Sequence, residues 1–109
     1  MSRYARRADA SHQDVLRTLR ASGLAVRDLS RAGDGCPDLA VSFGSRTAFV
    51  EVKTPGTYYG KRLNEQQQTW AEGWEGELLC LRTAEEAMQW AVEWKRQELP
   101  AARQRRGKA

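Results

Sequence analysis

Two runs of strand-forming residues separated only by Gly44-Ser45 constrain the fold of this chain more than any other feature. The runs cover residues 38–43 and 46–53, and a two-residue link that begins with glycine is typical of a tight β-hairpin turn. If Gly44 and Ser45 are the two central residues of that turn, the numbers of directly paired residues add up to 89. The sequence therefore predicts both a hairpin and its register.

This register places two carboxylates opposite each other on one face of the hairpin. Asp38 faces Glu51, and the alternation of side chains along a strand puts Lys53 on the same face. Opposed Cβ atoms lie about 4.5 to 5.5 Å apart, so the two negative charges repel each other unless a cation lies between them. The other face is apolar and predicts a buried surface formed by Leu39, Val41, Ala48, Val50 and Val52.

These polar residues suit the chemistry of phosphodiester hydrolysis. Mg²⁺ takes oxygen ligands, commonly one or two carboxylates with waters and a substrate phosphate, and Asp38 and Glu51 match that preference. The backbone carbonyl of Val52 offers a further ligand, and Lys53 could orient or deprotonate an attacking water and offset negative charge in the transition state. The residues alone leave a second interpretation open: a solvated sheet face with a Glu51–Lys53 ion pair, where Asp38 is a turn residue.

The remaining segments predict the order αβββαβα. Gly23 follows a helical pattern that starts at Ser11, and Thr83 with Glu86 has the spacing of a helix cap. The predicted elements are, in chain order, a helix from Ser11 to about Gly23, strands over 25–29, 38–43 and 46–53, a helix capped by Asn64 and ending near Gly73 or Gly76, a strand over 77–82, and a helix beginning at Thr83.

The net charge of +4 is unevenly distributed over the 109 residues. The first seven residues carry +3 and the last fifteen carry +5, whereas the body between them carries −4. We expect a basic N-terminal arm over 1–8, one α/β domain over 9–95, and a basic tail over 96–109 without regular structure. Basic ends suit phosphate backbones and an acidic body suits a divalent metal, although solvated termini explain the ends equally well.

Other classes of protein are disfavoured by composition. No apolar run approaches the roughly 18 residues that would span a bilayer, and the first residues lack the apolar stretch of a secretory leader. Cys36 and Cys80 are too few for a disulfide scaffold and have no metal-ligand spacing, so we interpret them as reduced thiols and expect no zinc site. The expected location is the cytoplasm, with no membrane partner.

Several motifs carry a family resemblance. Pro37-Asp38 followed by Glu51-Val52-Lys53 resembles the signature of the PD-(D/E)XK nuclease superfamily. The wider segments 33–41 and 48–53, together with Leu63, Gln67 and Trp70, resemble the small VRR-NUC family found in phage genomes and as a domain of larger repair nucleases. The resemblance covers roughly residues 9 to 92, and it implies a restriction-endonuclease-like αβββαβ(α) core with a central mixed sheet flanked by helices.

The resemblance also implies a Mg²⁺- or Mn²⁺-dependent DNA endonuclease. Asp38 and Glu51 would be metal ligands, Lys53 the catalytic lysine, and Gln67 a residue beside the site that touches substrate or the lysine. Gln67 also stands three residues after Asn64, so a helix-capping role is the alternative.

Two residues of the first helix are further candidates. An acidic residue there usually completes such sites, and Asp14 occupies that position, although its spacing from Ser11 also fits a helix cap. His12 is a candidate phosphate contact, or else a solvent-facing residue of the first helical turn. Four residues of the loop after the hairpin combine stacking planes with cations, as nucleic-acid-binding loops do, unless they form a plain surface loop: Tyr58, Tyr59, Lys61 and Arg62.

Small stand-alone members of this family resemble Holliday junction resolvases, which act as homodimers that each cut one strand of a branch. The predicted function is therefore a structure-selective endonuclease acting on branched or duplex DNA, as a homodimer, located in the bacterial host cytoplasm if a phage encodes it. One alternative is a non-catalytic nucleic-acid-binding module with the same fold. Another is a protein-interaction adaptor that uses the paired tryptophans at 70 and 74 and at 90 and 94, although we interpret these as core or dimer contacts.

Overall fold

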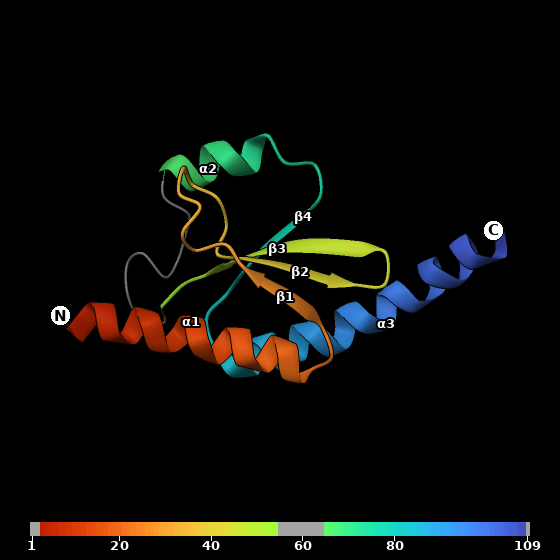
Figure 1. Ribbon diagram of the computed structural model, residues 1–109, viewed down its shortest axis with the longest axis horizontal. Coiled ribbons are helices and arrows are strands. Elements are labelled where there is room, and N and C mark those ends of the chain that lie inside the picture. Colours follow the sequence, from red (N-terminus) through yellow and green to blue (C-terminus); the bar gives the residue numbers. More distant parts are fainter. Residues whose placement is uncertain (1–2, 55–64, 109) are drawn as a thin grey trace.

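The computed structural model describes the backbone of residues 3–54 and 65–108, and the side chains of residues 10–54 and 65–97. The described elements follow the predicted order αβββαβα (Figure 1). They are α1 (Arg3–Ala21), β1 (Ala25–Asp28), β2 (Leu39–Phe43), β3 (Arg46–Val52), α2 (Glu65–Glu72), β4 (Glu77–Leu81) and α3 (Ala84–Lys108).

The four strands form one mixed sheet in the order β1-β2-β3-β4. The hairpin register is confirmed, because Val41 pairs with Ala48 and Phe43 pairs with Arg46. Gly44 has a φ of 64°, the left-handed conformation that this turn requires. Strand β1 is antiparallel to β2, whereas β4 is parallel to β3, so the chain crosses over the sheet through α2 between them.

The helices form a layer on each face of the sheet. Helices α1 and α3 lie side by side against one face, and α2 lies over the other (Figure 1). The predicted apolar face of the hairpin is confirmed as the core side, with Val52 packed at its margin. Four of its side chains are fully buried, namely Leu39, Val41, Ala48 and Val50. They pack against apolar residues of α1 and α3, chiefly Val15, Leu16, Leu19, Ala87, Ala91 and Trp94.

Helix α1 ends where the glycine predicts. Gly23 adopts a φ of 91°, and its N–H donates to the carbonyl of Arg20 while the N–H of Leu24 donates to the carbonyl of Leu19. This double hydrogen bond is the Schellman arrangement, which satisfies carbonyls at a helix end and needs a residue that tolerates positive φ.

The beginning of α1 differs from the prediction. The helix starts at Arg3, so Ser11 lies inside it and is not its N-terminal cap, and the arm predicted over 1–8 is helical from Arg3 onward. Residues 3–10 contain three alanines and three arginines with no glycine or proline. Strong helix formers without a breaker allow a helix to continue past a weak internal cap signal.

The end of α3 also differs from the prediction. The backbone is helical through Lys108, where the sequence predicted a tail without regular structure over 96–109. Alanine, arginine and glutamine dominate residues 101–106, and these residue types favour helix. Pro100 lacks an N–H and so loses one helical hydrogen bond, but the helix continues beyond it.

Helix α3 is attached to the sheet by a cap and by a polar contact. The Thr83 hydroxyl accepts a 3.1 Å hydrogen bond from the N–H of Glu86, which confirms the predicted cap. The indole of Trp94 donates a 2.5 Å hydrogen bond to Glu77 of β4, and Arg46 pairs with the same carboxylate while lying 5.0 Å from the Trp94 ring. The contacts of Glu77 with Trp94 and Arg46 hold α3 against the first residues of β3 and β4.

The two tryptophan pairs pack on opposite sides of the sheet. Trp70 and Trp74 stack on each other and meet the ring of Phe49 edge-on, which attaches α2 to β3. Trp90 stacks on Trp94, and Trp94 is buried in the core as predicted.

Within the described residues, no helix has the length and apolar character needed to cross a membrane.

Candidate functional site

The start of β2 and the end of β3 bring two carboxylates together. One oxygen of the Asp38 carboxylate accepts a 2.9 Å hydrogen bond from the backbone N–H of Val52. In return, the Glu51 carboxylate accepts a 3.2 Å hydrogen bond from the backbone N–H of Asp38. This reciprocal arrangement continues the hairpin register past the last ladder pair, so each carboxylate is held by the strand opposite its own.

Lys53 and Gln67 complete the group. The Nζ of Lys53 lies 3.3 Å from the Glu51 carboxylate and donates a 2.7 Å hydrogen bond to the side-chain oxygen of Gln67. Both partners of this ion pair are buried, Glu51 at 3% and Lys53 at 8% exposure. The structure thus brings together four residues that the sequence predicted to share a site, and the Glu51–Lys53 ion pair among them is buried and not part of a solvated sheet face.

The Glu51 carboxyl has a perturbed pKa. The pKa of Glu51 is raised from 4.5 to about 7, first by burial and then by the charge of Asp38 and a hydrogen bond to its side chain, while the charge and hydrogen bond of Lys53 act in the opposite direction. The repulsion between the two carboxylates was expected from the sequence, whereas the burial of Glu51, which is the larger cause, was not. A titratable group whose pKa is shifted to near neutral by burial and by a specific charged partner is a frequent feature of functional sites.

The loop before β2 carries Asp38 into position. It is closed at its base by a 2.7 Å hydrogen bond from the N–H of Leu29 to the carbonyl of Asp38. At its tip, three consecutive residues have positive φ: Gly33, Asp34 and Gly35. A Cβ at Gly35 would lie 2.4 Å from the backbone oxygen of Gln66, so only glycine allows the loop to approach α2 this closely.

Gly35 is a site residue whose role the sequence reasoning missed. Its contact with the first turn of α2 holds the loop of Asp38 beside the helix that carries Gln67. Gly35 lies in the motif, directly before Cys36-Pro37-Asp38. The backbone that leaves no room for a side chain there belongs to Gln66, in a segment distant in the sequence. Only the crossover connection brings the two together.

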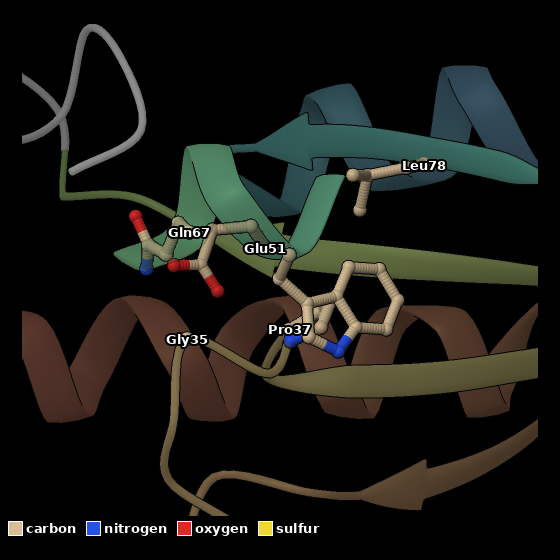
Figure 2. Close-up of a pocket in the computed structure, with 6 residues that line it drawn as sticks. Gly35, Pro37, Glu51, Gln67 and Leu78 are labelled. Atoms are coloured by element: carbon tan, nitrogen blue, oxygen red, sulfur yellow. The ribbon is translucent and has the colours of Figure 1, made fainter. Parts of the chain in front are cut away.

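A small pocket opens beside the carboxylates (Figure 2). In the close-up, the Glu51 and Gln67 side chains lie at one end of the pocket and Leu78 lies at the other. Its lining combines residues from the loop, the sheet and α2, namely Gly35, Pro37, Glu51, Gln67, Trp70 and Leu78. A second, wider hollow adjoins α2 and is lined by Asp34, Glu65, Gln66, Thr69 and Trp70.

Both cysteines lie near this group, and neither forms a disulfide. Cys80 pairs with Glu51 in the parallel β3–β4 ladder, an adjacency that the sequence analysis did not predict because it depends on the crossover. Burial and the charge of Glu51 raise the pKa of the Cys80 thiol, and burial with the charges of Glu51 and Asp38 raises the pKa of the Cys36 thiol. Both effects disfavour the reactive thiolate.

The contacts that the structure gives for Asp14 and His12 are with residues outside this group. Asp14 is exposed, and its carboxylate lies 3.7 Å from Arg17 on the next turn of α1. The Nε2 of His12 lies 3.1 Å from Asp28 at the end of β1. Hydrogen bonds from Ser30, and then from His12, lower the pKa of Asp28 to about 2 despite its slight burial. His12 is therefore attached to the sheet by Asp28 and is not a free surface residue.

Two sets of predicted residues fall outside the described part of the chain. Asn64, the predicted cap of α2, is one of them. The others are the candidate nucleic-acid contacts of the loop after β3, Tyr58, Tyr59, Lys61 and Arg62. Gln67, the partner predicted for a cap with Asn64, directs its side-chain oxygen to Lys53.

Asp38 and Glu51 are the described residues that could hold a magnesium or manganese ion. Among residues 10–54 and 65–97, no group of three histidine, cysteine or acidic side chains is arranged to hold a metal ion. Mg²⁺ commonly keeps several waters and takes only one or two carboxylates, which Asp38 and Glu51 provide. The N–H of Val52 donates to the Asp38 carboxylate. In a β-strand the N–H and C=O of one residue point to the same side, so the Val52 carbonyl also points toward Asp38.

Comparisons of this chain with models of protein families, with curated proteins and with solved structures returned no match.

Proposed function

We propose that this protein is a metal-dependent DNA endonuclease of the PD-(D/E)XK type, similar to the VRR-NUC family and built on its restriction-endonuclease-like core. The observation that supports this best is the convergence of Asp38, Glu51 and Lys53 at the adjoining ends of β2 and β3. A carboxylate pair beside a buried lysine matches what hydrolysis of a phosphodiester requires: ligands for a hard cation and a positive group near the attacked phosphorus.

Asp38 and Glu51 would hold Mg²⁺ or Mn²⁺, with the carbonyl of Val52 as a further ligand. When bound, such an ion supplies Lewis acidity at the phosphate and lowers the pKa of a coordinated water. The burial and raised pKa of Glu51 support this assignment. In the metal-free protein a proton on Glu51 relieves its repulsion from Asp38, and a bound divalent cation would relieve the same repulsion.

Lys53 would act on the water and on the charge that develops during attack. The Lys53 ammonium has three N–H donors. Two of them face Glu51 and Gln67, so the ammonium can also donate to a water or a phosphate oxygen. Gln67 would orient the lysine through their hydrogen bond. The expected products carry 5′-phosphates, as the resemblance to the nuclease superfamily implies.

A module that only binds nucleic acid is less well supported by this arrangement. Two carboxylates beside the pocket repel a phosphate backbone, so a site with no metal would weaken DNA binding. Branched DNA remains the proposed preferred substrate and a homodimer the proposed assembly, both on the family resemblance.

The test is cleavage of a panel of labelled DNA structures in Mg²⁺ or Mn²⁺, including a four-way junction, a flap, a single strand and a plain duplex. Wild type should cut at least one of them, and Asp38→Asn and Lys53→Met should each lose about a hundredfold or more in rate. Asp34→Asn is the matched control, since Asp34 is an exposed acid four residues away on the same loop. Equal cleavage by wild type, Asp38→Asn and Lys53→Met would refute the assignment.

Calorimetry of Mn²⁺ binding separates this proposal from the binding module. Metal uptake that is lost in both Asp38→Asn and Glu51→Gln is expected for the nuclease. Salt-sensitive DNA binding with no metal uptake would favour the module instead.

A further inference from the structure

Helix α3 presents an apolar strip to solvent on the side away from the core. Met88 and Val92, one helical turn apart, are 53% and 48% exposed. Together with Trp74, they are the large hydrophobic residues classed as exposed in the described part of the chain. Ala87, Ala91 and Trp94 on the other side of the same helix are buried, so the exposure of the strip does not result from a loosely packed helix.

Charges of opposite sign flank this strip. Glu85 precedes Met88 by three residues and Arg96 follows Val92 by four, so both lie next to the strip on the helix surface. Both are exposed, and Arg96 makes a 3.6 Å contact with Glu93, in which the two side chains are 72% and 58% exposed. Read from the N-terminal end, the strip is acidic, apolar, apolar and basic.

That order is complementary to itself when reversed. Two α3 helices packed antiparallel about a two-fold axis near residue 90 would place Met88 against Val92 of the other copy. The same register would place Glu85 beside Arg96 of the other copy, on both sides of the axis. If both flanking residues carried the same charge, the antiparallel packing would place like charges beside each other at both ends of the contact.

We propose that this face of α3, formed by Glu85, Met88, Val92 and Arg96, is a homodimer interface whose occupant is the same face of a second copy. Burial of the four apolar side chains at the axis would supply the attraction, and the two exposed ion pairs would select the antiparallel register. The contact is small, since it uses one face of one helix from each copy, so we expect a weak dimer. The proposal does not depend on the nuclease assignment.

Sedimentation of the full-length chain in EDTA without DNA tests the interface. The wild type should show a mass that rises from monomer toward dimer between about 5 and 200 µM, the range of a small interface. Met88→Glu should weaken the dimer about tenfold or more by placing a charge in the apolar strip. Thr47→Glu, on an exposed position of β3, is the control with the same added charge, and circular dichroism checks that both variants fold.

Charge exchange tests the register. Glu85→Arg and Arg96→Glu should each weaken self-association by about tenfold, because each creates two like-charged pairs. The double variant should recover it, and a mixture of the two single variants should form a heterodimer in which both ion pairs are restored. A monomer mass for the wild type at about 200 µM would overturn the proposal. A dimer unaffected by Met88→Glu, or by the single exchanges, would also overturn it by showing that another surface is used.

Discussion

The side-chain oxygen of Gln67 on α2 accepts a 2.7 Å hydrogen bond from the Nζ of Lys53, which follows the end of β3. This bond joins the crossover helix to the strand that carries the proposed catalytic group. The position of the lysine ammonium therefore depends on helix α2, which is connected to β3 through residues 55–64.

Loss of that bond should slow cleavage without removing the metal. We expect Gln67→Ala to lower the rate by about tenfold to a hundredfold, the usual effect of removing a residue that orients a functional group. The affinity for Mn²⁺ should stay unchanged, since Asp38 and Glu51 remain, whereas the pH–rate profile should shift. Gln67→Glu keeps an acceptor and should retain more activity than Gln67→Ala. Gln97→Ala, exposed on α3, should behave as wild type.

Metal binding should weaken as the solution becomes acidic. The pKa of Glu51 is raised to about 7 by burial and by Asp38, so a bound ion must displace a proton at lower pH. The Mn²⁺ affinity is expected to fall about tenfold between pH 8 and pH 6, because the ionised fraction falls by that factor. Calorimetry at the two values measures it, and an unchanged affinity would contradict the assignment of Glu51 as a ligand.

The same carboxyl should make the metal-free protein less stable at high pH. Its pKa in the folded protein lies above the ordinary value of 4.5, so the folded state favours the protonated form. The contribution of Glu51 to stability is then complete below pH 4.5 and is lost as the pH rises through 7. Glu51→Gln should therefore raise the melting temperature in EDTA at pH 8 and change it little at pH 5. A lower melting temperature at pH 8 would show that Lys53 outweighs Asp38.

Gly35 and Gly33 offer a matched pair for the loop that carries Asp38. Both have positive φ, 77° and 75°, but a Cβ at Gly33 would meet nothing within 4 Å, whereas one at Gly35 would collide with the backbone of α2. Gly33→Ala should cost about 1 kcal/mol of unfolding free energy from backbone strain alone. Gly35→Ala should cost about 1 to 3 kcal/mol more, or displace α2. Urea unfolding measures the difference, and equal losses would argue against the contact.

The contact of Glu77 with Arg46 and Trp94 should contribute modestly to stability. Glu77 accepts the Trp94 indole hydrogen bond and pairs with Arg46, but its side chain is 41% exposed. Glu77→Ala is expected to lower the free energy of unfolding by about 1 to 2 kcal/mol, mainly by leaving the buried indole without its acceptor. Glu75→Ala, an exposed glutamate two residues earlier, should have no measurable effect in the same urea titration.

The hairpin was predictable because its register depends on local sequence. Gly44-Ser45 set the turn, and the pairing of Val41 with Ala48 followed from it, as did the proximity of Asp38 and Glu51. The alternation of apolar residues then identified the core side. Local turn chemistry and strand alternation are sufficient for elements whose partners are a few residues away.

Features that depend on distant segments were not predictable in the same way. The contact of Gly35 with α2 and the pairing of Cys80 with Glu51 both require the parallel crossover, whose packing no local pattern specifies. Helix limits were the other weak point, because the Ser11 cap signal competes with helix formers on both sides of it. The contact of Asp14 with Arg17, three residues further along the same helix, was likewise not predicted.

Neighbouring residues of β3 serve opposite sides of the sheet: Val50 is sealed among the helices α1 and α3, and Glu51 faces the pocket under α2. A strand with this alternation lets the two layers vary independently. Substitutions among the aliphatic residues on the α1 and α3 side can therefore alter the stability of the fold while the side that carries the proposed site keeps its arrangement. Thermal stability and the proposed activity could thus be changed by substitutions at different positions of this 109-residue chain.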